Sequence, residues 1–316
     1  MNPATMLRGT YDYGLVALSV GLAISASYAA LDLTGRVSSS QGRTRAIWLT
    51  AGASAMGLGI WAMHYVGMLA LTMPMPVYYH LPTVMLSLVA AIAASGVALR
   101  VVGRPQMTVT QEIAGSLVMG SGIAAMHYIG MAAMRCSATI VYDLRIVALS
   151  IVLAIVISLV ALILAFRVKD EQGITRQKIL SALIMGSAIP LMHYMGMWAA
   201  AFHYSAALPD LTHAVGISTL GVVAISTSTF LVLAVAIASS FFDRYMAQHK
   251  GHLNLARERE LYFQTMAEAV PEIIWTADPN GEDDFFNRRC FEYTGLTLKQ
   301  MRGTGWKVCV HADDLE

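Results

Sequence analysis

Long apolar stretches separated by short polar breaks dominate this chain. A helix needs roughly 20 apolar residues to cross the hydrocarbon core of a membrane. Seven stretches are that long, at residues 11–32, 47–72, 81–101, 110–133, 143–166, 177–200 and 214–241. The pattern therefore predicts an all-α polytopic membrane protein with seven transmembrane helices over residues 1–242.

Composition supports a membrane protein. Only 13% of the residues are charged and 56% are hydrophobic, and the mean hydropathy is +0.58. Soluble proteins carry about 25% charged residues, so most of this chain is expected to face the lipid bilayer or other apolar helices. The formal net charge of +1 gives no reason to expect a nucleic-acid partner. The first apolar stretch is long enough to be a spanning helix, and we do not expect it to be a cleaved signal peptide.

Lysine and arginine predict the orientation of the bundle, because they concentrate in cytoplasmic loops. The breaks after the first, third and fifth predicted helices hold Arg36, Arg43, Arg45, Arg100, Arg104, Arg167, Lys169, Arg176 and Lys178. The opposite side holds only Arg8, Arg135 and Arg145. The N-terminus is therefore predicted outside and the C-terminus in the cytoplasm.

One hexapeptide occurs three times, at Met63–Met68, Met126–Met131 and Met192–Met197. Each copy reads Met-His-Tyr, one variable residue, and Gly-Met, and lies near the C-terminal end of the second, fourth or sixth predicted helix. Two crossings separate successive copies, so all three share one depth in the membrane. Histidine is costly in hydrocarbon, and a regular spacing indicates a triplicated two-helix repeat. We therefore expect a functional site.

The residue types of the motif indicate a soft metal. In a helix the histidine and the methionine four residues later lie on one face. Imidazole and thioether groups together suit copper, and they do not suit Mg²⁺ or Ca²⁺. The methionine just before each histidine is the weaker candidate, because it lies about 100° further around the helix. The candidate metal ligands are His64, His127, His193, Met68, Met131, Met197, Met63, Met126 and Met192.

The arrangement of these ligands is left open by the sequence. Three imidazoles could bind one ion, three His–Met pairs could bind separately, or the motif could serve packing alone. The tyrosines beside the histidines could close the site or lie at the membrane interface. Seven residues before each motif, a methionine recurs and is expected to pack: Met56, Met119 and Met185. On the outer side, a metal entry path or ordinary loops could contain Met73, Met75, His80, Met134, Cys136, His203 and His213.

At these motifs the chain resembles the MHYT family of bacterial integral-membrane sensor domains, over residues 11–242. The family is named for a repeated Met-His-Tyr-Thr motif and has seven helices. This sequence departs from it at the fourth position, where Val66, Ile129 and Met195 stand. The resemblance implies that the domain binds copper and senses a diatomic gas, such as oxygen, carbon monoxide or nitric oxide, or redox state.

The remainder of the chain is more polar. Residues 243–267 alternate charged and apolar side chains, which predicts an amphipathic connector helix, with a break near Gly251. Residues 268–316 resemble the first half of an α+β PAS domain, with a hairpin turning at Asp278-Pro279-Asn280-Gly281. A PAS fold needs about twice as many residues, so the domain is expected to be incomplete and the chain a fragment or a truncated product. A homodimer is expected through the connector and the PAS part.

These features predict a membrane-bound sensor in signal transduction, which passes a signal to a cytoplasmic PAS and output module. The chain carries no nucleotide-binding loop, phosphoacceptor helix or catalytic acidic pair, so we do not expect it to be an enzyme itself. Family architecture implies that the full-length protein carries a histidine kinase of a two-component system or, as second choice, a cyclic-di-GMP enzyme. The alternatives are a copper transporter, a haem-binding electron-transfer protein and an inert scaffold.

Overall fold

The computed structural model describes residues 6–7, 9–171, 175–279 and 283–314. By their internal contacts these residues form two compact units, Met1–Ser239 and Ser240–Glu316. The first unit holds the three motifs, and the second holds the polar C-terminal part of the chain.

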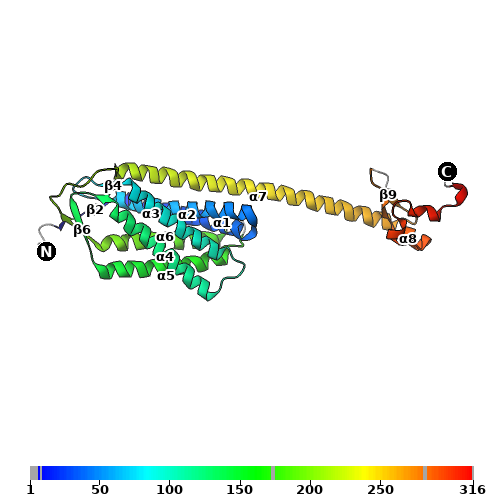
Figure 1. The fold of residues 1–316 in the computed structure, drawn as a ribbon, viewed down its shortest axis with the longest axis horizontal. Coiled ribbons are helices and arrows are strands. Elements are labelled where there is room, and N and C mark those ends of the chain that lie inside the picture. The colour runs from blue at the N-terminus through cyan, green and yellow to red at the C-terminus, as the bar shows by residue number, and fades with distance from the viewer. Residues whose placement is uncertain (1–5, 8, 172–174, 280–282, 315–316) are drawn as a thin grey trace. The chain divides into compact units, whose positions relative to one another are not determined.

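Within the described residues, six helices of the first unit are long and apolar enough to cross a membrane. They are α1 (Tyr13–Ser39), α2 (Gly42–Ala70), α3 (Leu81–Val102), α4 (Val109–Ala132), α5 (Leu144–Val168) and α6 (Arg176–Trp198) (Figure 1). Each of the six coincides with a predicted span. Polar side chains cap several N-termini: Asp12, Thr108, Asp143 and Thr175 accept hydrogen bonds from the first backbone amides of α1, α4, α5 and α6.

Helix α1 continues seven residues beyond its predicted end at residue 32, because the charges that follow have partners inside the protein. Asp32 pairs with Arg36 one turn later, at 3.4 Å, and with Lys178 of α6, at 3.1 Å. Lys178 is almost completely buried. Hydropathy alone places the helix end at the first charge, whereas here the charges neutralise one another within the bundle.

Helix α7 spans Ile217–Ala269 and contains the predicted connector and all but residues 214–216 of the seventh predicted span. The expected break is wrong, because Gly251 lies inside the continuous helix. One glycine costs a helix only about 1 kcal/mol. Among the described residues, the apolar stretch of α7 is Ile217–Val232, which is shorter than the six spans above. Within the first unit, the backbone carbonyl of Ser239 accepts a hydrogen bond from Arg36 of α1.

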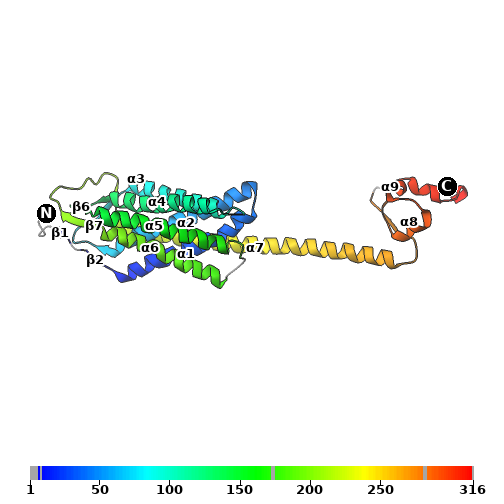
Figure 2. The ribbon, with the colours of Figure 1, turned by 90° about the horizontal axis from the view of Figure 1, so that it is seen from below.

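The six spanning helices form a closed ring. Each packs against the next along the chain, and α6 packs against α1. Figures 1 and 2 show α1–α6 running side by side, with the short strands gathered at one end. Across the ring, α2, α4 and α6 contact one another, and so do α1, α3 and α5. A pair of helices therefore occurs three times around one axis, as α1–α2, α3–α4 and α5–α6.

The strand end of the bundle was not predicted. Among the described residues, eight short strands lie at this end: two precede α1, and two lie between each of α2, α4 and α6 and the helix that follows it. They form the sheets β1 (Met6–Leu7)–β7 (Ala200–Tyr204)–β6 (Ala138–Tyr142), β5 (Met134–Arg135)–β4 (Tyr78–His80)–β8 (Ala214–Gly216), and β2 (Thr10–Tyr11)–β3 (Leu71–Thr72). All their pairings are antiparallel. Strands of two to five residues are too short to show an alternating pattern in the sequence.

The second unit contains the predicted hairpin, as the antiparallel strands β9 (Trp275–Ala277) and β10 (Asp283–Phe286). Of the predicted turn, Asn280 and Gly281 lie outside the described residues. Helices α8 (Arg288–Thr294) and α9 (Leu298–Met301) and the 3₁₀ turns η2 (Gly305–Cys309) and η3 (Ala312–Asp314) follow. Asn287 is fully buried, and its side-chain amide donates to the carbonyls of Ala267 and Glu272, at 2.9 Å each.

Candidate metal centre

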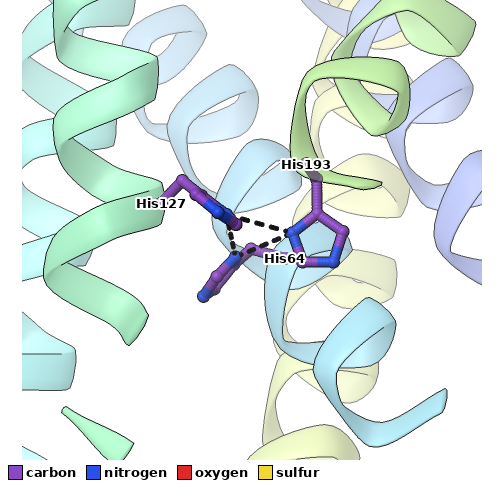
Figure 3. A group of neighbouring side chains, drawn as sticks. All are labelled: His64, His127 and His193. Carbon is purple, nitrogen blue, oxygen red and sulfur yellow. Dashed lines mark hydrogen bonds between the residues drawn. The ribbon is translucent and has the colours of Figure 1, made fainter. Parts of the chain in front are cut away.

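The three motif histidines meet at one point in the bundle. His64 of α2, His127 of α4 and His193 of α6 point toward one another (Figure 3), and each is completely buried. The Nδ1 atoms are 3.1 Å apart between His64 and His193 and 3.2 Å apart in the other two pairs. The ring planes are nearly perpendicular, at 86–88°. Of the arrangements that the sequence left open, this geometry favours one shared site.

A glycine in each motif makes this convergence possible. A side chain on Gly67 would meet Nε2 of His193, one on Gly130 would meet His64, and one on Gly196 would meet His127. Each hypothetical Cβ would lie closer than 3.0 Å to that nitrogen, which is tighter than real contacts allow. The glycine three residues after each histidine therefore opens space for the imidazole of a neighbouring helix.

Hydrogen bonding alone cannot satisfy the three Nδ1 atoms. In a neutral imidazole each nitrogen either donates a hydrogen bond or accepts one. Three mutual contacts among three such atoms always leave at least one pair in which both atoms donate or both accept. A mismatched buried polar pair is costly, and so is an unpaired buried charge. One cation that accepts all three lone pairs would remove the mismatch.

The dimensions of the triad suit a metal ion. Three atoms at these separations lie on a circle whose radius is about 1.8 Å, and metal–imidazole bonds are about 2.0–2.1 Å long. Among the described His, Cys, Asp and Glu side chains, these three are the group placed to share an ion. Three imidazoles suit copper, zinc, iron or nickel, whereas Mg²⁺ and Ca²⁺ require oxygen ligands. The residues present therefore fit a transition metal.

The six motif methionines lie in two apolar clusters, displaced in opposite directions along the helices. Met63, Met126 and Met192 are buried in a cluster that also contains Met56, Met119 and Met185. Met68, Met131 and Met197 are buried in a second cluster toward the strand end, with Trp61 and Tyr65. Their predicted role as metal ligands stays a prediction. The upstream methionines lie in the packed interior, as expected.

Sequence reasoning missed three serines that hold the motif tyrosines. The hydroxyls of Tyr65, Tyr128 and Tyr194 lie 3.4, 2.7 and 3.1 Å from those of Ser87, Ser150 and Ser19. Each tyrosine ring also lies against the imidazole of its own motif, with centroids 4.8 Å apart. Their regular spacing could have identified these serines, because they recur along the sequence at nearly the spacing of the motifs. The tyrosines thus link each even-numbered helix to an odd-numbered neighbour.

A ring of apolar helices in three repeats, closed around a buried histidine triad, defines a triplicated membrane domain. The family model described as a bacterial signalling protein N-terminal repeat matches residues 2–47, 57–115 and 120–176, together about half of the chain. The chain belongs to this family, MHYT, as the motifs indicated. The six apolar helices and the family fit a multi-pass protein of the bacterial inner membrane.

Curated relatives share this part of the chain. A bifunctional diguanylate cyclase/cyclic di-GMP phosphodiesterase, MucR of Pseudomonas aeruginosa, is 43% identical over 239 residues, which are 75% of this chain and 35% of MucR. The signaling protein YkoW of Bacillus subtilis is 39% identical over 63% of this chain and 25% of its own length. The cyclic di-GMP phosphodiesterase NbdA of P. aeruginosa is 39% identical over 63% of this chain and 26% of NbdA. The chain thus spans only about a third or less of each relative. No solved structure matches it.

Proposed function

We propose that this chain is the membrane sensor part of a longer bacterial signalling protein, and that His64, His127 and His193 together hold one copper ion. The observation that carries the proposal is the triangle of three completely buried Nδ1 atoms, 3.1–3.2 Å apart. Neutral nitrogen ligands in an apolar surrounding suit copper in its monovalent or divalent form.

Copper would supply a coordination position open to an outside ligand, because only three of its positions are filled by imidazoles. A diatomic gas such as oxygen, carbon monoxide or nitric oxide, or a change of redox state, is the proposed signal. The protein's own part is to hold the imidazoles, through Gly67, Gly130 and Gly196, and to exclude water from around them. Met68, Met131 and Met197 are the proposed additional ligands, and Met63, Met126 and Met192 are weaker ones.

The relatives favour the second of the two predicted outputs. MucR is named for making and degrading cyclic di-GMP, and NbdA for degrading it. We therefore place cyclic-di-GMP turnover ahead of a histidine kinase as the output of the full-length protein. In this proposal the chain itself is a sensor without catalysis, and residues 243–267 and a PAS part at 268–316 connect it to the output.

The proposed topology has the N-terminus outside, the first part of α7 as a seventh span, and the C-terminus in the cytoplasm. The strand end of the bundle then faces outward. Leu208, in the loop between β7 and β8, is 92% exposed. In a Cys136→Ser background, we expect Leu208→Cys to react with a membrane-impermeant maleimide on intact cells, whereas the exposed native Cys309 reacts only after lysis. The opposite pattern of labelling would reverse the orientation.

A homodimer through α7 is part of the proposal. On this helix, large apolar side chains are left exposed at Leu255, Leu261, Tyr262 and Met266, at 47–68%. Exposed apolar stripes of this kind are typical of helices that pair with another copy.

The alternatives fit the triad less well. A copper transporter would need soft ligands at successive depths of the bundle, whereas the histidines meet in one layer. A bis-histidine haem would place a porphyrin between two imidazoles, but here the Nδ1 atoms of His64 and His193 are 3.1 Å apart. An inert scaffold would leave the mismatched histidine contacts without a reason.

Metal content and a visible spectrum of the detergent-purified chain, after growth with copper, test the proposal. We expect stoichiometric copper without a Soret band. A Soret band would replace copper by haem, and a chain that stays free of copper after reconstitution with Cu(I) would refute the copper proposal.

A further inference from the structure

Three pairs of tyrosines lie between the histidine triad and the strands. Each motif tyrosine packs edge-on against a second tyrosine, which lies in a strand two residues before the start of an odd-numbered helix. The ring centroids are 5.8, 5.5 and 5.9 Å apart in the pairs of Tyr194 with Tyr11, Tyr65 with Tyr79, and Tyr128 with Tyr142. The three-fold repeat of the motifs thus extends to the strand end, and the copies can be compared position by position.

The tyrosine pair of the third motif copy borders an open pocket. Tyr11 and Tyr194 are half-buried, and both line a pocket of about 910 Å³ between the sheet β1–β7–β6 and the strands β2 and β3. Met6 and Trp198, in the same lining, are 52% and 72% exposed, so the pocket opens to the surroundings of the bundle. It is large enough for small molecules, whose sites usually measure about 300–1,000 Å³.

The tyrosine pair of the first motif copy is closed. Tyr65 and Tyr79 are completely buried, and they pack in one apolar cluster with Leu220 and Ala224 of α7. The motif is therefore repeated, but its surroundings are not, because α7 packs at the first copy. Of these two copies, the third is the one whose tyrosine is accessible.

Tyr194 contacts both the pocket and the surroundings of His193. Its hydroxyl lies 3.1 Å from that of Ser19, so the tyrosine joins α6 to α1. A Cβ on Gly67 would lie 3.4 Å from this hydroxyl and 2.6 Å from Nε2 of His193, so both groups border the same small space. Met197, one turn after His193, also lines the pocket and is 5% exposed. His193 itself is completely buried.

We propose that the triad is reached from this pocket and that Tyr194 is the gate. Opening requires the rotation of one side chain and the loss of one hydrogen bond, whereas entry elsewhere would separate closely packed helices. In this role Tyr194 is not a ligand; it sets the rate at which a metal ion or a diatomic molecule enters. That these are the entering species rests on the proposed function, whereas the route itself does not.

The reactivity of an engineered thiol tests the route without any metal. In a Cys136→Ser/Cys290→Ser/Cys309→Ser background, Met197→Cys places a thiol at the inner wall of the pocket. Met131→Cys is the matched control, because Met131 holds the equivalent position in the second copy, lies in the same apolar cluster and is completely buried. The full chain in detergent is treated with methyl methanethiosulfonate, and mass spectrometry follows the modification over time.

We expect Met197→Cys to react about tenfold faster than Met131→Cys or more, because a thiol enclosed by helices reacts only when the protein opens locally. Adding Tyr194→Phe keeps the ring and removes its hydrogen bond to Ser19. The rate at position 197 should then rise about fivefold, the factor to which one ordinary hydrogen bond corresponds. Tyr65→Phe, the matched change in the closed first copy, should leave that rate unchanged.

Equal rates at positions 197 and 131 would overturn the route, and a rate that Tyr194→Phe leaves unchanged would overturn the gate. Should the cysteine variants misfold, the speed of Co(II) uptake by Tyr194→Phe in the otherwise native chain is the second test. We expect faster uptake than in the wild type and in Tyr65→Phe, and equal speeds in all three would overturn the gate. A wild type that takes up no Co(II) would count against the metal at the triad, while the thiol rates still decide the route.

Discussion

Gly67→Ala is a sharp test of the triad, because it adds one methyl group beside an imidazole. The new Cβ would lie 2.6 Å from Nε2 of His193, whereas ordinary contacts begin at 3.4 Å. The imidazole would have to move by about 0.8 Å, and ligand sites tolerate only about 0.5 Å. Overpacking of this kind costs about 1–3 kcal/mol. We therefore expect a less stable protein that binds metal weakly.

Gly21→Ala is the matched control, since a Cβ at that position in α1 has no heavy atom within 4 Å. Alanine is the better helix former by about 0.5–1 kcal/mol, so this variant should be as stable as the wild type or slightly more so. Thermal unfolding in detergent and Co(II) titration measure both effects. Wild-type metal affinity and stability in Gly67→Ala would refute the close packing of His193 against α2.

Two further predictions concern charge and a thiol. Lys178→Met should lower the free energy of unfolding by about 3 kcal/mol, because it leaves Asp32 in the bundle without one of its cationic partners. Adding Asp32→Asn to this variant should restore most of the lost stability. Unfolding in SDS measures both effects, and equal stability of the single and double variants would contradict the pairing. Burial raises the pKa of the Cys136 thiol above its usual range, so little thiolate is present at neutral pH. In a Cys290→Ser/Cys309→Ser background, alkylation of Cys136 should therefore accelerate about tenfold per unit from pH 7 to 9, and a rate that levels off below pH 8 would contradict the raised pKa.

The sequence predicts the spanning helices well because lipid imposes a long, uniform apolar pattern. Among the described residues, the six helices that meet the length and hydropathy requirement all lie where the pattern predicts them. The ends are less well predicted, as α1 illustrates. Its last turns carry Asp32 and Arg36, whose partners lie on α6 and at Ser239 and are far away in sequence. Only the packed bundle reveals that these charges are neutralised.

The site itself follows from symmetry that the sequence displays. Three equally placed histidines predict one shared depth, and the structure brings their Nδ1 atoms together. The way in which they meet depends on contacts between helices, which no single motif encodes. Gly130 is needed for His64 of another helix, and Tyr128 is held by Ser150 of α5. The short strands were missed because their pairing joins loops that are distant along the chain.

Metal stoichiometry of the three single variants His64→Ala, His127→Ala and His193→Ala tests the shared site most directly. Each purified variant is titrated with Cu(I) and with Co(II) beside the wild type, and bound metal is counted per chain. Because one ion would depend on all three imidazoles, we expect one Co(II) per wild-type chain and nearly complete loss in every variant. A loss of about one third in each variant, or no loss, would contradict a single centre at His64, His127 and His193.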